Sequence, residues 1–113
     1  MKLEINVPTL QIFDAMISGI EGGIQYWARV ESYWRPARGV AIDDPATDLQ
    51  LACDLIDRDT GERIVLRDQW ALGLRLMAER YSRKFAELVE GSADATTGDV
   101  FIQLTAFGEL RYG

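Results

Sequence analysis

Apolar and polar residues alternate with a period of two in several stretches of the chain, as they do in strands with one buried face. The first stretch is 2–7, and a second runs over 24–34, where aromatic residues also favour an extended segment. Two further runs, 49–55 and 64–66, are separated by a stretch rich in turn formers, 57–62. These last two runs predict a β-hairpin.

Apolar residues recur at spacings of three and four in three other stretches, which predicts helices with one apolar stripe. The first helix begins after Thr9 and ends at Gly22 and Gly23, because glycine readily takes the left-handed backbone of a helix C-terminus. A single long helix is predicted over 68–90, and a short one over 99–107. The stripe of the long helix consists of Trp70, Leu74, Met77, Tyr81, Phe85 and Leu88.

The order of these elements predicts an α+β fold, with a small antiparallel sheet of three or four strands and two or three helices on one face. The segment 35–47 contains two prolines and a glycine and is expected to be irregular. At 113 residues, with 48% apolar and 27% charged side chains, the chain has room for one packed domain. We therefore expect a single domain over 1–113.

The formal net charge is −6, from 18 acidic and 12 basic side chains. A protein that grips a phosphate backbone presents a basic face, so we expect no general binding of nucleic acid. An acidic surface can instead be offered to a basic partner. Because a domain of this size leaves much of its surface exposed, a homo-oligomer would also help to stabilise it.

Cysteine content and hydropathy both point to the cytoplasm. No stretch approaches the ~20 apolar residues that span a bilayer, and residues 1–4 lack the apolar segment of a secretory signal. The one cysteine, Cys53, allows no internal disulfide and fits a reducing compartment. It lies in an apolar run, which favours a buried, inert thiol over a nucleophile. We expect a cytoplasmic protein that does not contact a membrane.

The chain has no histidine, which removes the commonest general base and the commonest metal ligand. With a single cysteine, a structural zinc site is excluded as well. The adjacent Asp43 and Asp44 are weak evidence for a hard cation, because such an ion needs convergent oxygen ligands. We therefore expect no catalytic residues, no metal and no cofactor. An enzyme that degrades a nucleotide through carboxylate-bound magnesium is the least favoured alternative.

One candidate binding feature is the block Glu21-Gly22-Gly23 followed by Tyr26 and Trp27. The carboxylate would accept from an exocyclic amine, and the glycines would let a ligand approach the backbone closely. The aromatic rings would stack on a flat ligand such as a base. The alternative interpretation is structural: the glycines end a helix and the aromatic residues belong to the core.

The second candidate is the pair Asp99 and Gln103, which share one face of the last predicted helix at i,i+4. That face points away from the apolar Val100 and Leu104, so the pair would present hydrogen-bonding groups to a ligand. The alternatives are a solvated helix face and, for the nearby Asp94, a role as helix cap.

Both candidates lie in motifs. Residues 20–27, Ile-Glu-Gly-Gly-Ile-Gln-Tyr-Trp, resemble the (L/A)-E-G-G-x-x-Y-W block of a group of small uncharacterised phage and prophage proteins. Residues 94–104 and 107–113 resemble the closing block of that group, D-x-x-T-A-D-x-x-x-Q followed by F-G-E-x-x-Y-G. With the helix between them, the resemblance covers nearly the whole chain. Gly98 departs from it, because the group usually has alanine there.

The resemblance implies a phage-borne accessory protein in which both motifs form one ligand site. The residues of that site are Glu21, Gly22, Gly23, Tyr26, Trp27, Asp99 and Gln103. It favours counter-defence by sequestration, in which the site captures a nucleotide-derived immune signal of the host, of cyclic-nucleotide or ADP-ribose type, without catalysis. Arg29, Arg35 or Arg38 would hold the phosphates. The alternative is an anti-CRISPR-like inhibitor that blocks a host defence protein by direct binding.

Overall fold

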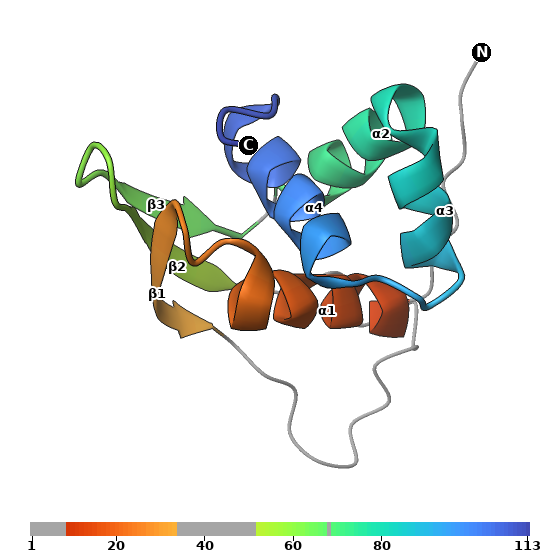
Figure 1. Ribbon diagram of the computed structural model, residues 1–113, viewed down its shortest axis with the longest axis horizontal. Coiled ribbons are helices and arrows are strands. Elements are labelled where there is room, and N and C mark those ends of the chain that lie inside the picture. The colour runs from red at the N-terminus through yellow and green to blue at the C-terminus, as the bar shows by residue number, and fades with distance from the viewer. Residues whose placement is uncertain (1–8, 34–51, 68) are drawn as a thin grey trace.

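The computed structural model describes residues 9–33, 52–67 and 69–113 (Figure 1). The described elements are α1 (Thr9–Ser18), a π-helical turn η1 (Gly19–Gly23), β1 (Ala28–Tyr33), β2 (Cys53–Asp57), β3 (Arg63–Leu66), α2 (Trp70–Arg80), α3 (Ser82–Val89) and α4 (Ala95–Phe107). Three parts of the prediction lie outside the described residues. They are the strand over 2–7, the irregular segment over 35–47, which contains Arg35, Arg38, Asp43 and Asp44, and the first residues of the run over 49–55. No helix in the described ranges is both long and apolar enough to cross a membrane.

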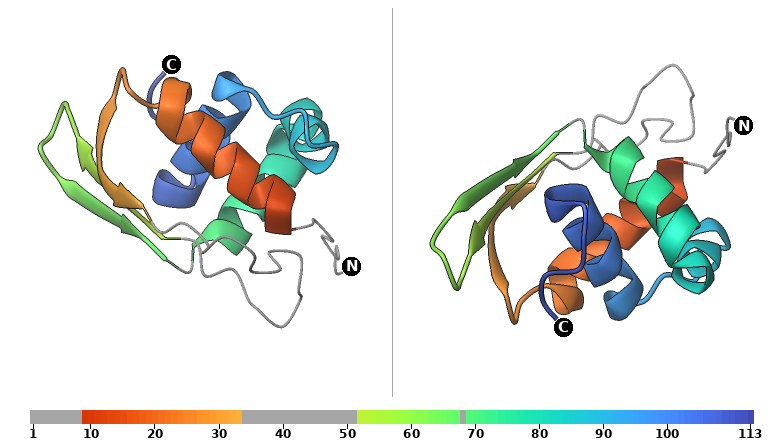
Figure 2. Two further views of the ribbon diagram at one scale, coloured as in Figure 1. Left: turned by 90° about the horizontal axis from the view of Figure 1, so that it is seen from below. Right: turned by 90° about the horizontal axis from the view of Figure 1, so that it is seen from above.

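The three strands form one antiparallel sheet in the order β1-β2-β3. β2 and β3 are the predicted hairpin. The register between β1 and β2 shifts between Val30 and Ser32, so Glu31 forms a bulge. The described helices all lie on one face of the sheet (Figure 2). The predicted α+β class, with a small antiparallel sheet covered on one face, is confirmed.

The prediction of a single long helix over 68–90 is wrong. Tyr81 leaves the helical conformation, with φ −133° and ψ 58°, and separates α2 from α3. The break changes the direction of the chain, so that α2 packs along α4 while α3 contacts both α1 and α4 (Figure 1). An apolar stripe has the same spacing in a straight helix as in two helices joined end to end, so periodicity could not reveal the break. The four described α-helices therefore exceed the two or three predicted.

The last helix begins at Ala95, four residues before the predicted start at Asp99. Asp94 is its cap: the side chain accepts from the backbone N–H of Thr97 at 2.8 Å. Residues 96–98 have weak helix propensity, but burial overrides it here, since Thr97 and Gly98 are both buried. The predicted end of this helix at residue 107 is confirmed, and Gly108 follows it with a φ of 73°.

Replacement of Asp94 by alanine tests the cap. We expect the free energy of unfolding at pH 7 to fall by about 1 kcal/mol, because the N–H of Thr97 loses its acceptor. That backbone hydrogen bond lowers the pKa of Asp94 in the folded state, so its contribution is present above the unfolded pKa of about 4 and is lost as the pH falls through the folded value. Urea denaturation at pH 7 and pH 3 should show the difference between wild type and variant shrinking at the lower pH. A difference that grows at pH 3 would contradict this role.

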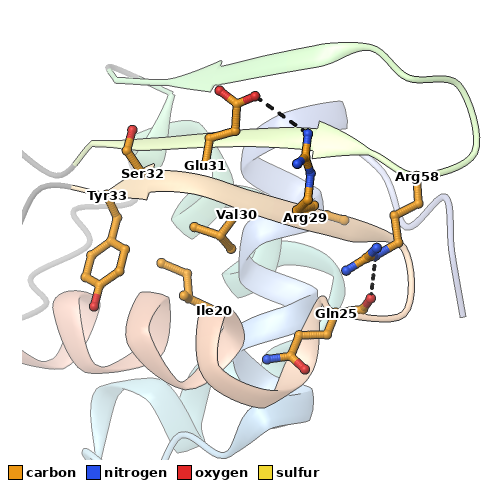
Figure 3. Close-up of a pocket in the computed structure, with 9 residues that line it drawn as sticks. Ile20, Gln25, Arg29, Val30, Glu31, Ser32, Tyr33 and Arg58 are labelled. Atoms are coloured by element: carbon orange, nitrogen blue, oxygen red, sulfur yellow. Dashed lines mark hydrogen bonds and ion pairs between the residues drawn. The ribbon is translucent and has the colours of Figure 1, made fainter.

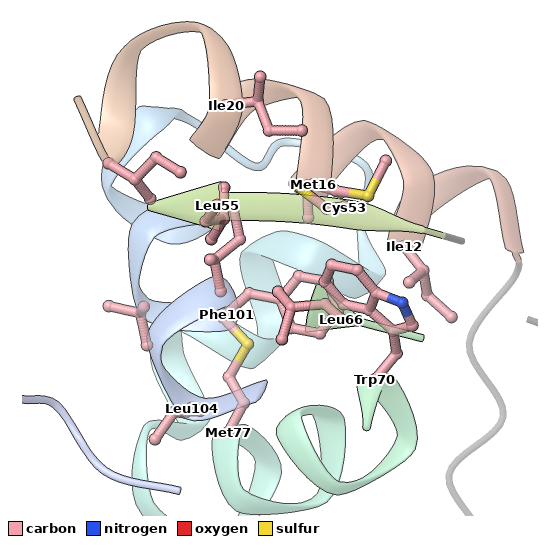
Figure 4. Packing of buried hydrophobic residues seen from close by; sticks show 14 of the residues in the cluster. Ile12, Met16, Ile20, Cys53, Leu55, Leu66, Trp70, Met77, Phe101 and Leu104 are labelled. Atoms are coloured by element: carbon pink, nitrogen blue, oxygen red, sulfur yellow. The ribbon is translucent and has the colours of Figure 1, made fainter. Parts of the chain in front are cut away.

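The core lies between the sheet and the helices, with α4 at its centre (Figure 4). Trp70 and Phe101 are fully buried, with ring centroids 5.4 Å apart. Cys53 is also fully buried, and burial raises the pKa of its thiol to about 12. The expected buried thiol is confirmed, and at neutral pH it stays protonated.

The helical backbone of α1 and η1 ends at Gly23, close to the predicted position. The glycines there do not take the left-handed conformation that the prediction assumed. Neither Gly22 nor Gly23 has a positive φ, and Ile24 follows with φ −95°. Gly23 instead lies against α4, where a Cβ would collide with the carbonyl oxygen of Ala95. The predicted extended segment over 24–34 is also shorter than expected: residues 24–27 form a turn, and the strand starts at Ala28.

Candidate functional site

The two sequence motifs meet at the carboxylate of Asp99. Its Oδ1 accepts from the indole Nε1 of Trp27 at 2.8 Å and from Nε2 of Gln103 at 2.9 Å. Its Oδ2 accepts from the hydroxyl of Tyr26 at 2.7 Å. Residues more than 70 positions apart thus share one acceptor, which joins the turn after η1 to the middle of α4.

Gln103 extends this arrangement to the segment 109–113. Its Oε1 accepts from the backbone N–H groups of Arg111 and Tyr112 at 2.8 and 2.9 Å, and its Nε2 donates to the carbonyl of Tyr112 at 3.0 Å. The side chain is 1% exposed. The carboxamide therefore binds the backbone of a segment that has no regular secondary structure, and the solvated helix face that was an alternative for Gln103 is wrong.

The indole of Trp27 is enclosed by other rings. It is 2% exposed and stacks on Tyr112, with ring centroids 5.3 Å apart and an angle of 13°, while Phe107 lies at 5.4 Å. The hydroxyl of Tyr112 donates to Oδ2 of Asp57 at 2.7 Å. The face of Trp27 on which a flat ligand would stack is thus occupied by Tyr112. We call Tyr26, Trp27, Asp99, Gln103 and Tyr112 the Asp99 network.

Both phenols of the Asp99 network are held in their protonated form. Loss of solvent and the hydrogen bond to Asp99 raise the pKa of Tyr26 to about 12. The hydrogen bond to Asp57 raises the pKa of Tyr112 to about 12. Burial raises the pKa of Asp57, but hydrogen bonds from Tyr112 and from the backbone of Asp59 outweigh it, and the pKa lies below its ordinary value. At neutral pH the hydroxyls donate and the carboxylates accept.

The structure therefore brings together five of the seven predicted site residues: Tyr26, Trp27 and Gln103 bond to Asp99, and Gly23 packs beside it. Tyr26 is 55% exposed, even though its hydroxyl is engaged by Asp99. Glu21 is exposed, and within the described residues its carboxylate has no hydrogen bond or ion pair. Gly22 is exposed, whereas Gly23 packs against α4. Ligand binding by these seven residues stays a prediction.

A second feature is an open groove of about 580 Å³ that runs between β1 and η1 (Figure 3). All six residues of β1 line it, although successive side chains of a strand point to opposite faces. A groove lined by every residue of a strand follows the edge of that strand. The remaining lining residues are Ile20, Gln25 and Arg58.

The groove has an apolar side and a charged end. Ile20, Val30 and Tyr33 point into the space between β1 and η1 (Figure 3). At the end nearest the start of β1, Nε of Arg58 donates to the carbonyl of Gln25 at 2.8 Å. Arg29 and Glu31 stand on the other side of the strand, where their charged groups are 3.9 Å apart.

The lining of the groove has a net charge opposite to that of the whole chain. Arg29 and Arg58 outweigh Glu31 by one positive charge, on a chain of net charge −6.

Of the residues that line the groove, Arg29 was expected from the sequence as a phosphate ligand. Gln25, Tyr33 and Arg58 were not expected as site residues. No local signal could have found Arg58, because the hairpin turn reaches Gln25 only through the sheet. Tyr112 did carry a signal, since it lies in the closing motif.

Within the described residues, no three or more Asp, Glu or Cys side chains are grouped so that they could hold a metal ion. The chain matches no family model, no curated protein and no solved structure.

Proposed function

We propose that the protein acts by binding rather than by catalysis, and that the groove beside β1 is its binding site. The observation that carries this proposal is that the whole edge of β1 lines an open groove with an apolar side and a guanidinium at one end. In the Asp99 network, by contrast, the polar groups bind one another and the main aromatic surface is covered.

Direct binding of a partner protein is the function that the groove favours. Strand edges bind extended protein segments through main-chain hydrogen bonds, and neighbouring pockets for alternate side chains add specificity. In line with the resemblance to phage proteins, the partner would be a defence protein in the cytoplasm of the host cell. By binding this partner, the chain would block its activity.

Sequestration of a nucleotide-derived signal is the second candidate, and the composition of the groove favours it. Arg29 and Arg58 would pair with phosphates, and Tyr33, which is 40% exposed, would stack on a base. The volume of about 580 Å³ falls within the range of small-molecule sites. This candidate keeps the ligand class expected from the sequence but moves it from Trp27 to the groove.

Site-specific photo-crosslinking tests direct protein binding. The photoreactive residue p-benzoylphenylalanine would replace Tyr33 in the groove or, as a matched control, Leu72 on α2, which is 44% exposed. We expect a covalent adduct with one bacterial protein from the Tyr33 position and none from Leu72, because only the groove contacts the partner. The adducted protein would then be purified and its affinity for the unmodified chain measured by calorimetry. Equal labelling from both positions, or no measurable affinity, would refute the proposal.

The same calorimetry with cyclic dinucleotides and cyclic ADP-ribose isomers tests the second candidate. If it holds, one of these ligands binds, and Arg58→Gln weakens binding about tenfold, which corresponds to ~1.4 kcal/mol. Arg83→Gln on α3 serves as the control, since Arg83 is exposed and remote from the groove lining. Failure of every nucleotide to bind would leave direct protein binding as the function of the groove.

A further inference from the structure

The backbone of β1 has hydrogen-bonding groups that face the groove. In an antiparallel pair, residues whose N–H and C=O groups face the partner strand alternate with residues whose groups face outward. The carbonyl of Trp27 accepts from the N–H of Arg58 across the sheet at 2.8 Å. By alternation along the register, the groups of Arg29 face β2, and those of Ala28 and Val30 face the groove.

The outward-facing backbone groups of β1 that are free to bond end at Ala28. The N–H of Ala28 already donates to the carbonyl of Ile24 at 2.8 Å, and the N–H of Trp27 donates to the same carbonyl. A strand added along the groove can therefore use the carbonyls of Ala28 and Val30 and the N–H of Val30, but its ladder cannot continue into the turn over 24–27. The added strand has to stop beside Ala28.

Arg58 lies at that end of the groove, next to Gln25 (Figure 3). A guanidinium has five N–H donors. Only Nε of Arg58 is used within the described residues, which leaves its two terminal nitrogens for a carboxylate. A strand antiparallel to β1 runs from the Tyr33 end towards the Ala28 end, so its carboxyl end arrives at Arg58. A parallel strand would bring its amino end there instead.

We propose that the groove binds the C-terminal segment of a partner protein, which adds to β1 as an antiparallel strand and places its terminal carboxylate on Arg58. This inference rests on the proposed function of direct protein binding. At about 3.3 Å per residue, the six residues of β1 accommodate a segment of about five or six residues. Alternate side chains of that segment face Ile20, Val30 and Tyr33, so apolar residues at every second position fit the groove.

The test uses randomised heptapeptides displayed with a free C-terminus, selected on the intact protein and then synthesised as free acid and as C-terminal amide. We expect the acids to bind and the amides to bind at least tenfold more weakly in calorimetry. Arg58→Gln should reduce the affinity for the acid to that for the amide, whereas Arg83→Gln on the remote helix α3 should change neither. Amide hydrogen exchange should slow at Val30 in the complex and stay unchanged at Ala28, whose N–H is already bonded.

Each other outcome overturns the inference. Selection of no peptide, or equal affinity for acid and amide, removes the terminal carboxylate from the interaction. Selected peptides that require an acidic side chain but tolerate amidation indicate a side-chain carboxylate instead. If a partner protein crosslinks at Tyr33 but binds Arg58→Gln normally, the inference fails while direct protein binding stands. If only a nucleotide binds in the groove, both fail in favour of sequestration.

Discussion

Replacing Gly98 with alanine is expected to lower the free energy of unfolding by about 2 kcal/mol or more, because α1 and η1 cross α4 at this residue. A Cβ on Gly98 would lie 2.5 Å from the carbonyl oxygen of Ala15 and from Cα of Gly19, and it would also collide with the backbone nitrogen of Gly19. Backbone atoms cannot rotate away as the end of a side chain can. The crossing elements would have to separate, which loosens packing throughout the core.

Helix propensity alone predicts the opposite sign. Alanine in a helix interior is more favourable than glycine by about 1 kcal/mol, so a Gly98→Ala variant of greater stability would show that the close crossing is not maintained. Urea denaturation followed by tryptophan fluorescence measures the difference. The control is Gly22→Ala, where the nearest atom to the new Cβ is Cβ of Ala95 at 3.5 Å, an ordinary contact. We expect its stability to change by no more than about 0.5 kcal/mol.

Gly19 and Gly98 together permit the close crossing, since each would collide with the other's backbone if it had a Cβ.

Asp99→Ala is expected to lower the free energy of unfolding by about 3 kcal/mol, because it leaves the buried Nε1 of Trp27 without an acceptor and removes one partner of Gln103. Tyr26 contributes less, since it is exposed and its hydroxyl can turn to water. Asp99→Asn keeps an accepting oxygen for Trp27 and should lose about half as much. Urea denaturation of both variants measures these differences.

Tyr26→Phe is the control for the Asp99 variants, because it removes one donor and leaves both buried donors bonded. We expect a loss below about 1 kcal/mol. The comparison also separates a structural role from ligand binding. If Asp99→Asn abolished binding of a nucleotide or a partner without lowering stability, Asp99 would belong to a ligand site, as the sequence suggested, and the structural role would be refuted.

The Asp99 network gives a physical reason for the two motifs to occur together. Asp99 needs the donors of Tyr26 and Trp27, and Gln103 needs the backbone of the closing segment. Losing one motif leaves buried polar groups of the other unpaired. Joint occurrence of the motifs therefore follows from the fold alone and does not by itself indicate a bound ligand.

Periodicity and turn chemistry were enough to predict the hairpin, the end of the last helix before Gly108, the α+β class and the helical regions, because each depends on residues a few positions apart. The break at Tyr81 and the start of α4 at Ala95 escaped prediction, since burial against other helices decides both. The sequence also singled out Tyr26, Trp27, Asp99 and Gln103. Only the crossing of η1 over α4 brings them within hydrogen-bonding distance, and only the sheet brings Arg58 to Gln25. A sequence pattern records which face of an element is buried, whereas the partner on that face is set by the path of the chain in three dimensions.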